Sequence, residues 1–428
     1  MMDMKNRSET VPGENERFEE LGRGCYAYSA DGCTNTGVII GDRGVLIVDG
    51  QATPALAEKV LAKVRELTDK PVKQVVLTHF HAASVLGASA FEPGEIIASD
   101  LTRRMMDTRS REEIRVSREL NPVLFEGLAG ETTGIAPSMT IASSMTIDLG
   151  GMDVRLMHLG RGHTMGDLVV WVPGSSVLFA GDLVQKSAAP YCGDAHLADW
   201  PRALDRISAF RPNALMPGSG KSAIGAQAVA AAIETTRDFV VTLRDGAAAC
   251  VEQSLGLKDT FQAVSDALAP HFASWADFEF HLPFNVARAY DEALGLDQPQ
   301  VWTRERCADL QDALSGAGTA GQPTAEQAAD AVETVEEQLT AAETDHVDDA
   351  GEAGSEERVA GLVSDSDFAA SLALAPEEDT DHEGLEPEGQ AQEETTLDLS
   401  AEDIIVSDGE TVADGSDSQA EKILENAR

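Results

Sequence analysis

Short apolar runs alternate along the chain with amphipathic segments of helical period, and polar or titratable residues follow the ends of the apolar runs. Residues 72–77 and 176–180 are two such runs and are predicted as buried strands. Residues 54–67 carry apolar side chains at helical spacing, and residues 99–120 form a second, strongly charged helical segment. This alternation indicates an α/β fold whose functional residues gather at strand ends.

A break in composition separates this part of the chain from its C-terminal quarter. Residues 321–428 hold 32 Asp and Glu against 3 Lys and Arg, and so carry −29 of the formal net charge of −42. Such a segment cannot bury enough apolar surface to offset the entropy lost on ordering. We predict four parts: a flexible leader at 1–17, a globular domain at 18–223, a helical extension packed on it at 224–315, and a disordered acidic tail at 316–428.

The acidic balance also restricts the partners. Nucleic acids and anionic membranes are both bound through basic groups, so no nucleic acid and no membrane is expected as a partner. A small-molecule substrate responds to the local field of its pocket and is not excluded. The acidic tail is a candidate site for binding a protein partner, and the sequence leaves the oligomeric state open.

Cysteine usage and apolar content bear on the compartment. The five cysteines are widely separated and form no C-x-x-C pair, which favours a reducing environment. The first 23 residues lack the apolar run of a signal peptide, and no stretch reaches the roughly 18–20 apolar residues that span a bilayer. The expected location is the cytoplasm.

Four fragments carry the residues with chemistry: 78–84 (THFHAAS), 162–167 (GHTMGD), 179–182 (FAGD) and 217–220 (PGSG). His79 and His81 follow a predicted strand two positions apart, so both imidazoles can point at one ion. His163, from another strand end, would complete three neutral nitrogen ligands and leave a fourth tetrahedral position for water, as catalytic zinc requires. Zinc lowers the pKa of such a water to about 7.

The four fragments, in this order, resemble the metallo-β-lactamase superfamily over residues 26–220. That family uses T-H-x-H-x-D-H, G-H-T-x-G-D, G-D and P-G-H-G segments at the edge of an αββα sandwich. The resemblance implies His79, His81 and His163 as ligands of a first metal, and Asp182 as a carboxylate bridging two metals. The implied fold class is α/β, a four-layer αββα sandwich, here with the C-terminal helical extension and the disordered acidic tail.

The second metal site of the family is substituted away in this chain. Ala83 stands where the family has an Asp, and Ser84 and Ser219 stand where it has two His. Alanine offers no lone pair, and a neutral serine hydroxyl is a poor substitute for imidazole or carboxylate. The resemblance with these departures predicts a reduced site that holds one metal.

Three functions remain open on these residues. The first is a mononuclear zinc hydrolase of an ester, thioester or amide, in which Asp182 orients the attacking water or takes its proton. The second is an oxidoreductase similar to the persulfide dioxygenases of the superfamily, with one iron on His79, His163 and Asp182, a set of two His and one carboxylate that suits non-haem iron. The third is a non-catalytic scaffold that binds partners through its acidic tail.

Other polar residues carry weaker signals. Asp167 is expected to be structural. Arg161 and Lys221 lie near the predicted site loops; both are expected to be solvated basic residues, and the alternative is that either replaces part of the positive charge of the lost metal. The remaining histidines carry no spacing signal and are expected in surface or core positions: His158, His196, His271 and His281.

Overall fold

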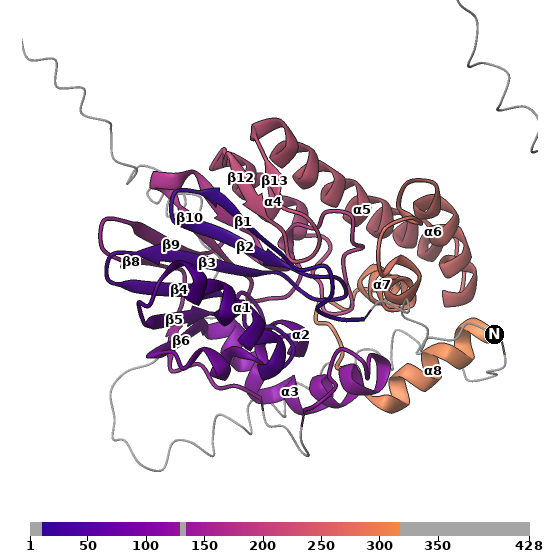
Figure 1. The fold of residues 1–428 in the computed structure, drawn as a ribbon. Coiled ribbons are helices and arrows are strands. Elements are labelled where there is room, and N and C mark those ends of the chain that lie inside the picture. Colours follow the sequence, from indigo (N-terminus) through magenta and orange to yellow (C-terminus); the bar gives the residue numbers. More distant parts are fainter. Residues whose placement is uncertain (1–10, 129–133, 317–428) are drawn as a thin grey trace, which may run out of the picture. The chain divides into compact units, whose positions relative to one another are not determined.

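A computed structural model describes residues 11–128 and 134–316, all of which belong to the first of two compact units, Met1–Ala375 and Pro376–Arg428 (Figure 1). The disorder predicted for the tail and for residues 1–10 falls outside the described residues. Residues 11–16 of the predicted leader are described, and they are tied to the domain. Gly13 N–H donates to Asp31 O at 3.0 Å, and Asp31 N–H donates to Glu14 O at 2.9 Å. The domain therefore begins before residue 18.

The described residues form two sheets, one of seven strands in the order β1-β2-β3-β4-β5-β6-β7 and one of six in the order β13-β12-β11-β10-β9-β8. The first sheet contains β1 Arg17–Gly22, β2 Cys25–Ser29, β3 Thr36–Gly41, β4 Gly44–Val48, β5 Val72–Val76, β6 Glu95–Ser99 and β7 Met139–Ile141. The second contains β8 Ser144–Asp148, β9 Asp153–His158, β10 Leu168–Val172, β11 Val177–Phe179, β12 Ala214–Met216 and β13 Ala223–Ile224.

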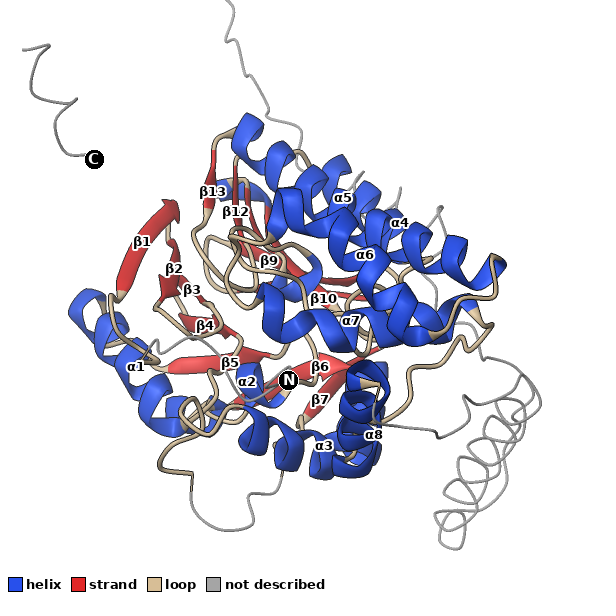
Figure 2. Ribbon diagram, turned by 90° about the vertical axis from the view of Figure 1, so that its right-hand side faces the viewer, coloured by secondary structure: helices blue, strands red, loops and turns tan. Residues whose placement is uncertain are grey.

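Helices cover the outer face of each sheet, α1–α3 on one side of the sandwich and α4–α7 on the other (Figure 2). The α-helices are α1 Pro54–Leu67, α2 Ala82–Val85, α3 Asp100–Leu120, α4 Trp200–Ala209, α5 Ala226–Glu252, α6 Leu257–Phe272, α7 Phe278–Ala293 and α8 Arg304–Ser315. Three 3-10 turns are η1 Ala88–Phe91, η2 Pro173–Ser175 and η3 Gly181–Leu183. No helix in the described ranges is long and apolar enough to cross a membrane.

Local sequence explains where the two longer helices of the first layer begin. The Thr53 side chain accepts a hydrogen bond from Leu56 N–H and Pro54 occupies the first turn, so α1 starts there. The Ser99 side chain accepts from Thr102 N–H and starts α3 in the same way. Both helices were predicted within one residue of these bounds.

The sheets pack face to face because strand residues alternate between inner and outer faces. Leu46 and Val48 of β4 belong to the core between the sheets, which also contains Phe179 of β11. Val45 and Ile47, which alternate with them in sequence, belong to the core that joins the first sheet to α1 and α3. Burial on both faces of β4 explains its unbroken apolar run.

The second outer layer is built partly from the C-terminal extension. Trp171 of β10 shares a core with Trp200 of α4, Phe239 of α5 and Leu282 of α7. The order helix, sheet, sheet, helix confirms the predicted αββα sandwich. Since α5 and α7 belong to the extension predicted at 224–315, that segment completes the fourth layer.

Candidate metal centre

Three histidines from two strand ends converge in the structure. His79 and His81 follow β5, and His163 follows β9. Each offers one ring nitrogen to a cluster whose ligand atoms all lie within 4.8 Å of one another. All three residues are buried. The structure thus brings together the histidines that the sequence motif singled out.

The outer nitrogen of His79 is held by a buried hydroxyl. His79 Nδ1 lies 2.8 Å from Thr78 Oγ1, which in turn lies 2.9 Å from Asp49 Oδ2. With the Thr78 hydroxyl donating to Asp49, it accepts from Nδ1–H, so that His79 Nε2 carries the lone pair. That Nε2 atom is buried and has no hydrogen-bond partner among the described residues. A buried nitrogen left without a partner costs free energy unless an ion meets it.

The other two imidazoles are oriented in the same manner. His81 Nε2 lies 3.1 Å from Asp194 Oδ2, and His163 Nδ1 donates to the Tyr191 carbonyl at 2.9 Å. These contacts direct His81 Nδ1 and His163 Nε2 toward each other, 2.9 Å apart. Ligand histidines in metal sites hold their second nitrogen in this way.

Burial sets the protonation of the cluster. It lowers the pKa of His79 and of His163 well below the ordinary value, with a further contribution from the neighbouring imidazoles. Burial also acts to lower the pKa of His81, but Asp194, Glu113 and other acids together raise it. Neutral imidazole is the form that binds a metal, so the donor set, its orientation and the unpartnered His79 Nε2 all fit a metal ion.

Asp182, in η3, lies beside this cluster. Its Oδ2 is 3.8 Å from His79 Nε2 and 3.5 Å from His163 Nε2, too far for strong hydrogen bonds. Burial raises the pKa of this carboxyl group to about 6, against the opposing effects of His81 and Gln185. Gly218 lies directly against the carboxylate, since a Cβ there would come within 1.9 Å of Asp182 Oδ1.

Several known proteins are similar to this chain in sequence. The chain is 24% identical over 291 residues to a linear primary-alkylsulfatase from Pseudomonas sp., covering 59% of this chain and 54% of that protein. It is 35% identical over 98 residues to a type 2 metallo-β-lactamase of Bacteroides fragilis, 22% of this chain and 39% of the relative. A type 2 metallo-β-lactamase of Bacillus sp. is 23% identical over 200 residues, 45% of this chain and 70% of the relative.

The chain is thus similar in sequence to proteins of the metallo-β-lactamase superfamily, in agreement with the resemblance of its motifs. It spans about half the length of the alkylsulfatase that it matches. No protein-family model matches the chain. A solved metallo-β-lactamase from Pontibacter korlensis aligns with a TM-score of 0.41 and 21% identity, covering 53% of this chain and 99% of that one.

Neutral residues stand at the three positions where the superfamily has further ligands of a second metal. Ala83, Ser84 and Ser219 line one cavity together with Asp182. Gln185 accepts a hydrogen bond from Ser219 N–H at 3.0 Å, and its side chain also bonds to Asp182. One neutral amide thus connects the remaining carboxylate to the loop that carries a histidine in other members.

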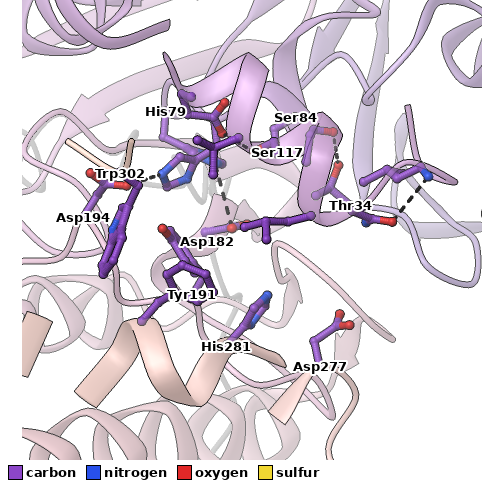
Figure 3. A pocket seen from close by; sticks show the side chains of 18 of the residues that line it. Thr34, His79, Ser84, Ser117, Asp182, Tyr191, Asp194, Asp277, His281 and Trp302 are labelled. Atoms are coloured by element: carbon purple, nitrogen blue, oxygen red, sulfur yellow. Dashed lines mark hydrogen bonds and ion pairs between the residues drawn. The ribbon is translucent and has the colours of Figure 1, made fainter. Parts of the chain in front are cut away.

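The cavity has a volume of about 150 Å³ and extends from the histidines toward α3 and α7. Asp182, Tyr191 and Asp194 surround it near the histidines, and His281 and Trp302 reach it from the C-terminal extension (Figure 3). The segment between Asp100 and Ile141, expected to overhang the site, supplies part of one wall through α3.

Two basic residues near the site loops lie outside the cavity. Arg161 does not line the cavity, because Asp199 and Asp297 bind its guanidinium at 2.7 and 2.8 Å. Lys221 is exposed and does not line it either. The Lys or Arg residue that does line it is Arg109 of α3, whose Nη1 lies 3.3 Å from Asp194 Oδ1.

Of the other polar residues considered from the sequence, Asp167 and His158 have structural roles, and His281 lies at the cavity. Asp167 accepts hydrogen bonds from Thr164 N–H at 2.8 Å and its hydroxyl at 2.7 Å, and so braces the loop that carries His163. His158 is buried and bonded to Asp167 O. His281, expected to have no site role, lines the cavity and donates through Nδ1 to Ala189 O at 2.9 Å.

Sequence reasoning missed the residues that hold the histidines. Asp49, Asp194 and Tyr191 belong to no recognisable motif, and they meet the imidazoles only through the fold. One signal was present for Asp49, a lone acid that ends an otherwise apolar strand. Asp194 and Tyr191 lie in a segment without regular structure and offered none.

Proposed function

We propose that this protein is a metal-dependent hydrolase whose single metal ion, zinc, is held by His79, His81 and His163. The observation that carries the proposal is the convergence of three buried ring nitrogens within 4.8 Å of one another, with His79 Nε2 lacking a partner in the described structure. Three neutral nitrogens with an open fourth position are the donor set of catalytic zinc sites. Zinc so bound supplies an activated water at neutral pH and polarises the bond under attack.

The protein's own groups have separate tasks in this proposal. Thr78, Asp194 and the Tyr191 carbonyl fix the three imidazoles through their outer nitrogens. Asp182 orients the attacking water or takes its proton, because its carboxylate is the acidic group beside two of the histidines. The substrate is an ester, thioester or amide, and relatives named for alkyl sulfate and β-lactam cleavage support hydrolysis as the reaction type.

A second candidate rests on the same distances. His79, His163 and Asp182 also face one another, with Asp182 Oδ2 3.8 and 3.5 Å from the two Nε2 atoms. Two His and one carboxylate would suit an iron-dependent oxidoreductase similar to persulfide dioxygenases. A third possibility, a non-catalytic scaffold that acts through its acidic tail, requires that the histidines bind no metal.

Metal content measured on matched variants separates the three. In the hydrolase, His81→Ala removes both metal and activity, whereas Asp182→Ala retains most of the metal and lowers turnover. If Asp182→Ala abolishes binding while His81→Ala spares it, the iron site is the correct assignment. His271→Ala is the control, because His271 is exposed on α6 and does not line the cavity. If neither His81→Ala nor Asp182→Ala changes metal content or activity, the histidines hold no functional metal and only the scaffold remains.

A further inference from the structure

One wall of the cavity is apolar and rigidly supported. It is formed by Val116 and Leu120 of α3, Leu124, Phe125, Phe284 of α7 and Trp302. Trp302 Nε1 donates to Gly193 O at 3.1 Å, and its ring packs edge to face on Phe284 with centroids 4.8 Å apart. A fixed apolar wall beside catalytic residues is typical of a pocket that orients an apolar part of the substrate.

The size of the cavity limits that part. A volume of about 150 Å³ equals that of an engineered apolar cavity that binds benzene. About six carbons is therefore an upper limit for the apolar part of a substrate, because the reacting group beside the histidines shares this volume.

The charged groups of the cavity restrict the other end of the substrate. Its lining includes the carboxyl groups of Glu113, Asp182, Asp194 and Asp277, against one Lys or Arg residue, Arg109. Arg109 is itself paired with Asp194 at 3.3 Å. Sulfate and phosphate groups are usually bound by Arg side chains that offer several donors to the anion. Apart from the metal ion of the proposed function, an anionic group would here meet four carboxyl groups and one Arg that is already paired.

The carboxyl group of Glu113 also disfavours an anion in the cavity. Its Oε1 accepts hydrogen bonds from Ala82 N–H and from the Ser117 hydroxyl, both at 3.1 Å. Its Oε2 is buried and has no hydrogen-bond partner among the described residues. A buried acceptor left open beside the cavity adds to its acidic lining and disfavours an anion.

We propose that the cavity takes a neutral carboxylic ester with an apolar group of up to about six carbons seated between α3 and Trp302, and discriminates against sulfate and phosphate esters. The inference rests on the proposed hydrolase function and narrows it. Water adds at the ester carbonyl carbon and the bond to the alkoxy oxygen breaks. The alcohol leaves with one proton, and the acid product releases the other to solvent.

Two substrate series test the proposal on the metal-loaded full chain, with proton release as the readout. Along ethyl, butyl and hexyl acetate, kcat/KM should rise by about fourfold per methylene, the value for full burial of that group. Hexyl sulfate, which carries the same chain on an anionic group, should react at least about a hundredfold more slowly than hexyl acetate. A flat acetate series, or hexyl sulfate as the better substrate, would overturn the proposal.

Variants of the apolar wall test whether the chain-length dependence of kcat/KM arises there. Leu120→Phe fills part of the cavity, so the ratio of hexyl to ethyl acetate kcat/KM should fall about tenfold. Leu294→Phe makes the same chemical change at an exposed position that does not line the cavity, and should leave the ratio unchanged. An equal ratio in both variants would contradict the assigned wall.

Binding of an inert ligand separates this inference from the hydrolase function. The probe is 4-nitrobenzyl alcohol, a neutral apolar alcohol with no bond to hydrolyse, whose nitro group quenches tryptophan fluorescence. Saturable quenching that Leu120→Phe weakens and Leu294→Phe leaves unchanged would support the pocket even if no ester is cleaved. Quenching that is the same in both variants would overturn it, even if some ester is cleaved.

Discussion

A hydroxyl and two acids decide how the histidines of this centre are presented. Thr78 Oγ1 lies 2.8 Å from His79 Nδ1 and 2.9 Å from Asp49 Oδ2, so one side chain fixes both the tautomer and the tilt of the ring. Asp194 does the same for His81 at 3.1 Å. The ligands are therefore oriented before any ion arrives, which lowers the cost of binding.

Thr78→Val tests this orientation. It keeps the shape of the side chain and removes the hydroxyl, leaving His79 Nδ1 and Asp49 without their common partner. Metal affinity, measured by competition with a chromophoric chelator, should fall by about 10–100-fold. Thr78→Ser keeps the hydroxyl and should stay close to the parent protein. Equal affinities for valine and serine would mean that the hydroxyl has no part in orienting His79.

Gly218 provides a second test at the scale of one residue. A Cβ at this position would lie 1.9 Å from Asp182 Oδ1, so Gly218→Ala must displace the carboxylate. Turnover should fall while most of the metal stays bound, since the three histidines are untouched. Gly174→Ala is the control, because a Cβ at Gly174 meets nothing within 4 Å. Loss of metal in Gly218→Ala would place Asp182 among the ligands.

Among the elements, α2 and the loop 217–220 face each other across the position of the lost second metal. Gln185 and Asn35 hold that loop, Gln185 by accepting from Ser219 N–H and Asn35 by donating to Pro217 O and Gly220 O, both at 2.9 Å. The loop is thus organised without a second ion. Restoring metal ligands on both α2 and the loop 217–220 should therefore recreate the second metal site without a change in the backbone.

The triple variant Ala83→Asp, Ser84→His, Ser219→His makes that change. Ligand identity and number set the occupancy of a metal site, so the stoichiometry should rise from about one toward two. Elemental analysis of the folded variant gives the answer, with Ala83→Asn, Ser84→Gln, Ser219→Gln as a control of similar bulk. A folded triple variant that still binds one metal or fewer would show that these loops do not match the second site.

The sequence predicted the secondary-structure elements and the three histidine ligands more completely than it predicted the residues that surround those ligands. The bounds of α1 were predicted from the periodicity of its apolar residues, and His79, His81 and His163 from spacing within a motif. Arg161, the alternative cation for the site, lies elsewhere, because nearness in sequence does not fix where a side chain points and its guanidinium binds Asp199. Arg109 and Asp194 reach the centre from segments 85 positions apart, so only the fold could show them.

At the scale of the whole molecule, the acidic tail and the metal centre are proposed to be separable. The described fold ends at Gly316, which terminates α8 with φ +76°, a conformation that suits glycine. A chain that ends after Gly316 lacks the segment with a formal net charge of −29. It should keep its metal content, and its melting temperature should change by no more than a few degrees. Loss of metal on this truncation would assign the tail a role in the centre.

The C-terminal extension, by contrast, is expected to be inseparable from the centre. Asn285 of α7 accepts from Cys192 N–H at 2.7 Å and donates to Pro190 O at 2.9 Å. Buried Arg288, one turn later, donates to Ala195 O at 2.7 Å. These hydrogen bonds fix the segment 190–195, which places Tyr191 and Asp194 against the histidines. The helix thus acts on the metal ligands from the fourth layer of the sandwich.

Asn285→Ala should therefore affect both stability and metal binding. It leaves a buried N–H and a buried carbonyl without their partner, which costs about 1–3 kcal/mol for each such group. Metal affinity should fall as well, because the freed segment no longer fixes Asp194 against His81 or the Tyr191 carbonyl against His163. Asn213→Ala, at an exposed position, is the matched control. Chemical denaturation of the metal-free protein measures the first effect and competition titration the second. A variant that loses stability but binds metal with unchanged affinity would show that α7 supports the fold alone.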